Sequence, residues 1–248
     1  MIHFLEHIYD RLARMLRLFA TMTLLHACLC SFAVAACKSE IINADKVAQR
    51  IANEWPLRPA RDIETRYVQR TAVSLAHTIK ARMHTRYFEW PAASWRFLLV
   101  RDLSVNAYSI GNGRVYLTDG TFDFVKNEAE LVAIIAHELA HQLLGHFCRY
   151  DEGHSEYRIG SLVQVMDNNK EMEADALAVE ILQLANFPAW AMLDIVKRLP
   201  VTMQSSLHKR LRIQALENQL RRVKRIPFSS SSEFLQIKKQ SSPLTLFE

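Results

Sequence analysis

The segment from residue 127 to residue 143 most constrains the fold, because it combines a helix start, an apolar stripe and a cluster of ionisable side chains. Asn127 and Glu130 match a capping box, which predicts that a helix begins at this point. Apolar residues then recur at helical spacing, at Leu131, Ile134, Ile135 and Leu139. This stripe predicts that the helix packs into the core.

The same helix contains the motif His137-Glu138-Leu-Ala-His141. An α-helix turns about 100° per residue, so histidines four residues apart lie one turn above each other and can both reach one zinc ion. Glu138 then lies beside the metal position, where it can accept a proton from an attacking water. His146 lies five residues beyond His141 and is therefore expected to be rotated well off the face that carries the ligands. The alternative is a buried helix with two incidental histidines.

A second acidic segment, Glu171-Met-Glu-Ala-Asp175, can complete a zinc site that two histidines leave open. Catalytic zinc sites have three protein ligands and one position for water. Glu171 and Asp175 share a helix face, whereas Glu173 lies about 200° from Glu171 around the helix. We therefore expect Glu171 to bind zinc and Asp175 to orient a ligating histidine by accepting its N–H. A solvated acidic helix face is the alternative.

These two motifs resemble those of the HtpX and CaaX-prenyl-protease type of zinc metallopeptidase, a gluzincin family, and in particular its soluble periplasmic or mitochondrial members. The resemblance spans roughly residues 60 to 225. It implies a zinc endopeptidase with one zinc ion per chain. In this reading His137, His141 and Glu171 are the zinc ligands, and Glu138 is the general base.

Residues 106–120 resemble the edge-strand hairpin of the same family. We therefore expect a peptide substrate to bind as an added strand at Asn106, Ala107 and Tyr108. One family feature is missing, a Thr/Ser-His-Pro sequence followed by an arginine. When the chain is aligned on Arg212, residues 205–207 read Ser-Ser-Leu, and His208 is out of register.

The first 36 residues predict a signal peptide, since three arginines precede an apolar run from Leu18 to Ala36. Met15 is an alternative start. Small residues followed by Cys37 match a lipoprotein cleavage site, which predicts a lipid anchor on Cys37 and a place on the periplasmic face of a membrane, the outer membrane in a Gram-negative source. Ordinary secretion and a retained membrane helix are the alternatives.

The order of the remaining elements predicts an α+β fold, a mainly helical zincin-type domain with a small sheet. Half of the residues are hydrophobic, enough for one substantial core. Helices are expected at 42–54, 62–86, 189–199 and 207–224, besides the two that carry the motifs, and strands at 95–101, 105–110 and 114–117. The predicted organisation is a linker or helix at 37–59, a metallopeptidase domain at 60–225 and a flexible tail at 226–248.

The formal net charge of +5 includes a basic cluster at Arg221, Arg222, Lys224 and Arg225. No aromatic residues interleave it, so a solvated helix end or an anionic-lipid contact is favoured and no nucleic-acid partner is expected. The motifs together predict a zinc endopeptidase acting on unfolded or misassembled envelope proteins. The alternatives are a lipid-anchored binding or chaperone module that cuts little, and a helical lipoprotein without zinc. The oligomeric state is left open.

Overall fold

The computed structural model describes residues 38–83, 94–147, 168–200 and 206–241. The chain divides into two units, Met1–Ala33 and Val34–Glu248, and the first unit lies outside the described residues. The predicted signal peptide and the predicted lipidation site at Cys37 therefore also lie outside them. Within the described residues, none of the helices is both long and apolar enough to cross a lipid bilayer.

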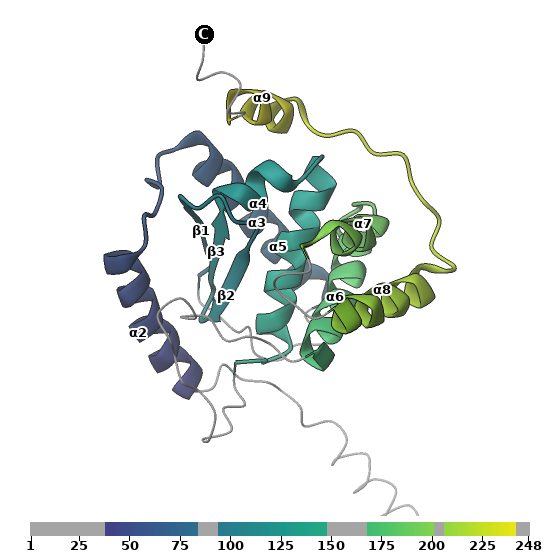
Figure 1. The fold of residues 1–248 in the computed structure, drawn as a ribbon, viewed down its shortest axis with the longest axis horizontal. Coiled ribbons are helices and arrows are strands. Elements are labelled where there is room, and N and C mark those ends of the chain that lie inside the picture. Colours follow the sequence, from purple (N-terminus) through teal and green to yellow (C-terminus); the bar gives the residue numbers. More distant parts are fainter. Residues whose placement is uncertain (1–37, 84–93, 148–167, 201–205, 242–248) are drawn as a thin grey trace, which may run out of the picture. The chain divides into compact units, whose positions relative to one another are not determined.

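Helices precede and follow a small sheet, which confirms the predicted α+β fold (Figure 1). In chain order the elements are α2 (Lys38–Glu54), α3 (Ile63–Met83), β1 (Arg96–Val100), β2 (Ala107–Gly111), β3 (Arg114–Thr118), α4 (Asp119–Phe124), α5 (Glu128–Leu143), α6 (Asn168–Leu184), α7 (Trp190–Arg198), α8 (Ser206–Leu220) and α9 (Ser232–Ser241).

The three strands lie in the order β1-β3-β2, with β1 parallel and β2 antiparallel to β3. A tight turn through residues 111–113 joins β2 to β3, and all three residues have positive φ, at 85°, 45° and 73°. Glycine and asparagine adopt this left-handed region most readily, so Gly-Asn-Gly is suited to the turn. Among the described strands only β3 pairs with β2, which makes β2 an edge strand, as the hairpin motif predicted.

Both faces of the sheet are covered because successive side chains of a strand point to opposite sides. Val115 and Leu117 of β3 belong to the main core, which contains α3, α5, α6 and α7. Tyr116, between them, packs in a smaller cluster with Val47 and Ile51 of α2. The sheet therefore holds α5 in place on one face and is closed by α2 on the other (Figure 1).

Helix α5 is buried on all sides rather than along one stripe. Its N-cap is as predicted, since the Asn127 side chain accepts a hydrogen bond of 3.0 Å from the backbone N–H of Glu130. Every residue from Ala129 to Leu143 is buried, including the ionisable ones. Its neighbour α6 contributes the fully buried Ala174 and Ala178, small side chains that allow the two helices to approach closely.

Part of the predicted flexible tail at 226–248 is helical, and the last residues of that tail, 242–248, lie outside the described residues. Residues 232–241 form α9, which buries Phe234 and Ile237 in the main core. The ring of Phe234 lies 6.0 Å from that of Tyr67 on α3. Burying a side chain of this size contributes about 1.5–3 kcal/mol, enough to hold a short helix against the domain. Only these two of its residues are buried, a signal too short for periodicity to reveal.

Candidate metal centre

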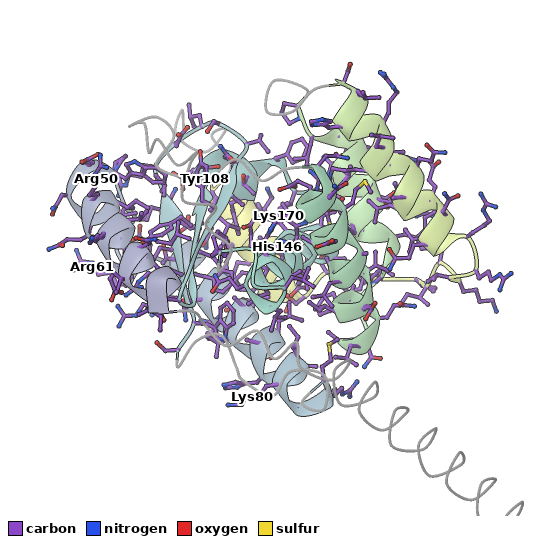
Figure 2. All side chains as sticks on the ribbon, turned by 90° about the horizontal axis from the view of Figure 1, so that it is seen from below. Arg50, Arg61, Lys80, Tyr108, His146 and Lys170 are labelled. Atoms are coloured by element: carbon purple, nitrogen blue, oxygen red, sulfur yellow. The ribbon has the colours of Figure 1, made fainter. Side chains whose placement is uncertain are left out.

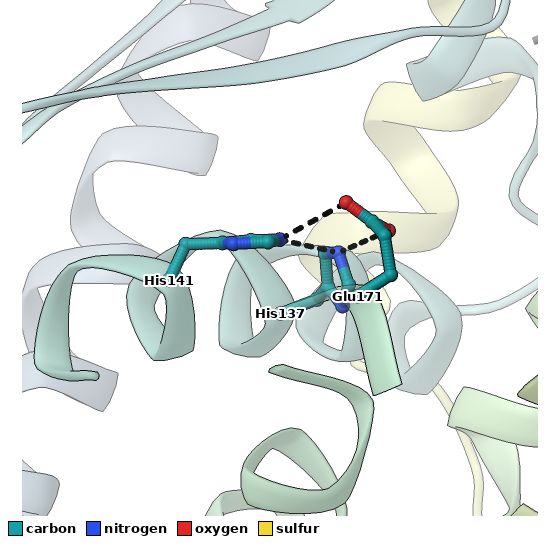
Figure 3. A group of neighbouring side chains, drawn as sticks. All are labelled: His137, His141 and Glu171. Carbon is teal, nitrogen blue, oxygen red and sulfur yellow. Dashed lines mark hydrogen bonds and ion pairs between the residues drawn. The ribbon is translucent and has the colours of Figure 1, made fainter. Parts of the chain in front are cut away.

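Three side chains from α5 and α6 direct donor atoms toward one point (Figure 3). His137 Nε2 lies 3.1 Å from His141 Nε2. Glu171 contacts the two nitrogens through different oxygens, Oε2 at 3.4 Å from His137 and Oε1 at 3.4 Å from His141. In a tetrahedral zinc site with bonds of about 2.0–2.1 Å, donors are about 3.3–3.4 Å apart, because a tetrahedron's edge is about 1.63 times its centre-to-corner distance. The closest approaches among the three side chains are therefore near the separations expected between ligands of one zinc ion, and one donor atom from each side chain lies within 4.8 Å of the others.

Asp175 lies one turn after Glu171 on α6 and approaches the other nitrogen of His137. Its Oδ1 is 3.0 Å from His137 Nδ1. The approach is too oblique for a well-formed hydrogen bond, and Nδ1 has no better partner among the described residues. The structure thus brings Asp175 to His137, whereas the sequence left open which of the two histidines it would orient, and the carboxylate contacts the ring without being aligned with its N–H.

Arg212 of α8 is a buried residue of this site that the sequence analysis used only as an alignment point. Its Nε and Nη2 donate to the two oxygens of Asp175, both at 2.7 Å, and its Nη1 lies 2.8 Å from Glu171 Oε2. Arg212 precedes Leu216 and Leu220 at four-residue spacing, and all three are buried. A charged residue in register with an apolar stripe is the signal that could have identified it.

The charges of the site shift the pKa values of its acidic groups. Burial acts to raise the pKa of Glu171, but contacts with both histidines and the charge of Arg212 hold it below the ordinary value. Burial acts in the same way on Asp175, and the charge of Arg212 again outweighs it and lowers the pKa. Both carboxyl groups are therefore ionised at neutral pH, the state in which a carboxylate binds zinc.

The two histidines differ in how readily they carry a proton. Burial acts to lower the pKa of His137, but the close contacts and negative charges of Asp175 and Glu171 outweigh burial and raise the pKa to about 10. Burial lowers the pKa of His141 below its ordinary value. His137 is therefore the histidine that holds a second proton more readily, and it would have to lose the proton on Nε2 before that nitrogen could bind a zinc ion.

Glu138 is buried next to the edge strand. Burial raises the pKa of its carboxyl group to about 7, against the opposing charge of His137, and the backbone N–H of Ser109 donates to it. Gln142, one turn later on α5, donates to Ser109 Oγ at 2.7 Å and accepts from the backbone N–H of Gly113 at 2.7 Å. Gln142 therefore links the β2–β3 hairpin to α5 by two hydrogen bonds, which fix the position of Glu138 relative to β2.

Of the predicted substrate-binding residues, Asn106 precedes β2 and the other two begin it. The backbone oxygen of Asn106 accepts from the N–H of Thr118 at 3.0 Å, so residues 106 and 108 face β3. The alternation of an antiparallel pair turns the backbone groups of Ala107 and Ser109 toward the open edge. The edge positions are therefore 107 and 109, while the side chains of Asn106 and Tyr108 contact each other.

His146 also belongs to the site, although sequence reasoning placed it off the ligand face. Its Nδ1 lies 2.8 Å from His141 Nδ1, and its Nε2 lies 3.2 Å from Glu173 Oε2. The helix ends at Leu143, so the 100° rule no longer applies at residue 146. A glycine at position 145, just after a predicted helix, is the signal that could have shown this reversal.

Comparison with known proteins gives one family and several relatives. Residues 63–159 match the family described as Peptidase family M48. The beta-barrel assembly-enhancing protease of Yersinia pestis is 24% identical over 136 residues, covering 42% of this chain and 28% of that protein. The Escherichia coli protein of the same name is 23% identical over 158 residues, covering 51% of this chain and 30% of that protein.

A eukaryotic protein shows a shorter match. The mitochondrial metalloendopeptidase OMA1 of Schizosaccharomyces pombe is 36% identical over 52 residues, covering 21% of this chain and 15% of that protein. Each of these relatives is thus matched over less than a third of its own length. The matches confirm the family resemblance drawn from the motifs.

Proposed function

We propose that this chain, which carries a peptidase family M48 domain, is a zinc-dependent endopeptidase with one zinc ion per chain. The observation that carries the proposal is the convergence of donor atoms from His137, His141 and Glu171, whose closest approaches of 3.1 and 3.4 Å are near the ligand separations of a tetrahedral zinc site. Support also comes from the family, whose members are zinc metallopeptidases.

The residues around the three ligands have separate tasks in this proposal. When bound, zinc would polarise the scissile carbonyl and lower the pKa of an attacking water. Glu138 takes the proton at its carboxylate and delivers it to the leaving amine. Asp175 orients His137, while Arg212 reaches from α8 and holds the carboxylates of Asp175 and Glu171, which lie one turn apart on α6.

The edge strand supplies a binding place for an extended peptide. The backbone groups of Ala107 face the open edge, and the N–H of Ser109 on the same edge donates to Glu138. A peptide added as a strand along residues 106–109 would therefore run past the catalytic carboxylate. Asn106 and Tyr108, whose side chains contact each other, would shape the start of this edge.

We propose that the substrates are unfolded or misassembled proteins of a cell envelope. Two of the relatives are named beta-barrel assembly-enhancing protease, which supports this class of substrate. The sequence before Cys37 supports anchoring by a lipid on the periplasmic face of a membrane, the outer membrane in a Gram-negative source. Incorporation of labelled palmitate into wild type but not into Cys37→Ser tests this anchor.

A second candidate function is a lipid-anchored binding or chaperone module that retains zinc and cuts little. The observation that favours it is the sequence Ser-Ser-Leu at 205–207, where the family has Thr/Ser-His-Pro. Zinc content and peptide cleavage of wild type and Glu138→Gln separate the candidates. Zinc with Glu138-dependent cleavage supports the endopeptidase, zinc without cleavage supports the binding module, and absence of zinc contradicts both.

A further inference from the structure

His146 contacts the ligand His141 from the side opposite to the metal position. The two Nδ1 atoms are 2.8 Å apart, and both rings are buried. On its far side, His146 Nε2 lies 3.2 Å from a carboxylate oxygen of Glu173. A line of polar contacts therefore runs from the metal position through two imidazoles to a carboxylate on α6.

The end of α5 fixes His146 relative to His141. Gly145 has a φ of 65°, a left-handed conformation that glycine adopts without a Cβ penalty. The backbone N–H of His146 then donates to His141 O, and that of Gly145 donates to Gln142 O, both at 3.0 Å. These are the two hydrogen bonds of a Schellman motif. The cap thus ties the two histidines together by backbone as well as by side chain.

The position of His146 is also fixed from α6. Lys170 Nζ donates to the backbone oxygen of His146 at 3.3 Å, and Figure 2 labels both residues. Glu171, the third donor of the metal site, is the next residue of the chain. The same turn of α6 therefore supplies a metal ligand, a contact to the His146 backbone and, at Glu173, a contact to its ring.

We propose that His146 is a positioning residue that holds His141 in the tautomer with its proton on Nδ1 and its Nε2 free to bind zinc. This inference rests on the proposed function. It gives His146 a role that sequence spacing alone would deny it. Through His146, Glu173 also acts on the site, although it cannot share the ligand face with Glu171.

The proton assignments follow from the neighbours at each end of the line. Of two facing Nδ1 atoms, one must donate and the other accept. A neutral His146 that accepts at Nδ1 carries its proton on Nε2, where it can donate to the ionised Glu173. If His146 instead carried its proton on Nδ1, the lone pair of its Nε2 would face the carboxylate of Glu173. The proton of His141 would then be on Nε2, in the metal position. Glu173 therefore favours the zinc-binding tautomer.

The two histidine ligands thus have different supports. His137 faces the buried carboxylate Asp175, whereas His141 faces a neutral imidazole. Glu173, at the end of this line, has a side chain that is 63% exposed. Solvent therefore screens its charge, and we expect the imidazole of His146 to contribute more to zinc binding than Glu173 does.

Substitutions of His146 that place a hydrogen-bond acceptor at different distances from the backbone test this role. In His146→Asn the amide oxygen can occupy the place of Nδ1, whereas in His146→Gln it lies near the place of Nε2, and His146→Ala has no acceptor. We expect zinc affinity, measured on the full chain by competition with a chromogenic chelator, to fall about 10–100-fold in the Ala and Gln variants. The Asn variant should stay within a few-fold of wild type.

His77→Ala, which removes an exposed histidine from α3, is the matched control and should bind zinc as wild type does. Wild-type affinity in His146→Ala would overturn the inference. Equal losses in the Asn, Gln and Ala variants would also overturn it, because a purely structural role does not depend on where the acceptor lies.

A second measurement uses the unaltered protein and so does not depend on whether a variant folds. In histidine-labelled, zinc-loaded wild type, ¹⁵N NMR should show His141 protonated at Nδ1 and His146 protonated at Nε2. A zinc-bound Nδ1 on His141, or a proton on His146 Nδ1, would overturn the inference. Loss of zinc binding in His141→Ala, with unchanged binding in His146→Ala, would reject the inference and leave the proposed function standing. Absence of zinc binding by wild type would reject both.

Discussion

Arg212 and Asp175 form a buried, two-pronged ion pair in which both nitrogen–oxygen distances are 2.7 Å. The guanidinium group reaches a third oxygen on Glu171, so one cation faces two carboxylates that are one helical turn apart. A buried charge is tolerated only when it is paired, and a planar guanidinium fits this pairing because it donates in parallel. Arg212 therefore joins α8 to the turn of α6 that carries Glu171 and Asp175.

The first prediction concerns this arginine. Arg212→Met leaves Asp175 and Glu171 without their cation, and we expect the zinc-free protein to lose about 3–5 kcal/mol of unfolding free energy. Zinc should restore part of the loss, because the ion brings positive charge to Glu171. Chemical denaturation with and without zinc measures both effects. An equally stable zinc-free variant would show that the pair is not needed for folding.

Arg212→Lys is the matched control for charge. It keeps a cation at the position but cannot donate to both oxygens of Asp175 in parallel. We expect a stability between those of wild type and Arg212→Met. If the lysine and methionine variants were equally destabilised, the geometry of the guanidinium rather than its charge would be decisive.

The second prediction separates two glutamates of α6. Glu171→Ala should abolish tight zinc binding, because it removes one of the three donors. Glu173→Ala should reduce zinc affinity only a few-fold, since its exposed carboxylate acts through His146. Metal content after gel filtration in limiting zinc checks both variants. Full zinc retention in Glu171→Ala, with loss in Glu173→Ala, would reverse the assignment.

The sequence predicted the relative position of two site residues only where both lie on the same helix. His137 and His141 share a helix, as do Glu171 and Asp175, so the helical period alone placed each pair on one face. That the two faces meet depended on packing, and the small Ala174 and Ala178 were the only local hint.

Helical periodicity does not predict the positions of two other residues of the site. Arg212 of α8 meets Asp175 of α6 across 37 residues, with the whole of α7 between them in the chain, and no local pattern encodes such a contact. His146 lies only five residues from His141, but the chain leaves the helix at the left-handed Gly145, so the helical angle per residue no longer gives the direction of the His146 side chain. Capping chemistry, rather than amphipathicity, decides where such a residue lies.

The third prediction concerns the general base. Glu138→Gln keeps nearly the same shape and should keep the fold and the zinc, but an amide cannot accept the proton of the attacking water. We expect peptide hydrolysis to fall on the order of 10²–10⁴-fold. Zinc content and turnover, measured on the same preparation, check the prediction. Cleavage at the wild-type rate would exclude Glu138 as the base.

The fourth prediction concerns α9, which sequence periodicity did not reveal. Phe234 is buried against the rings of Tyr67 and Phe122, so Phe234→Ala should cost about 3–5 kcal/mol of unfolding free energy. The next residue, Leu235, is 56% exposed, so Leu235→Ala should change stability by no more than about 0.5 kcal/mol. Equal effects in denaturant melts would indicate that α9 does not pack on the domain in solution.

The last prediction concerns Asp175, which contacts both His137 and Arg212. Asp175→Asn can still accept one hydrogen bond but carries no charge, so zinc affinity should fall about 10–100-fold. The loss has two possible routes, a less well oriented His137 or an Arg212 released from α6. A double-mutant cycle with Arg212→Met separates them, because effects on a shared route do not add. If Asp175 acts through His137, the double variant should bind zinc more weakly than Arg212→Met alone. An affinity equal to that of Arg212→Met would show that the arginine carries the effect, and wild-type affinity in Asp175→Asn would remove Asp175 from the zinc site.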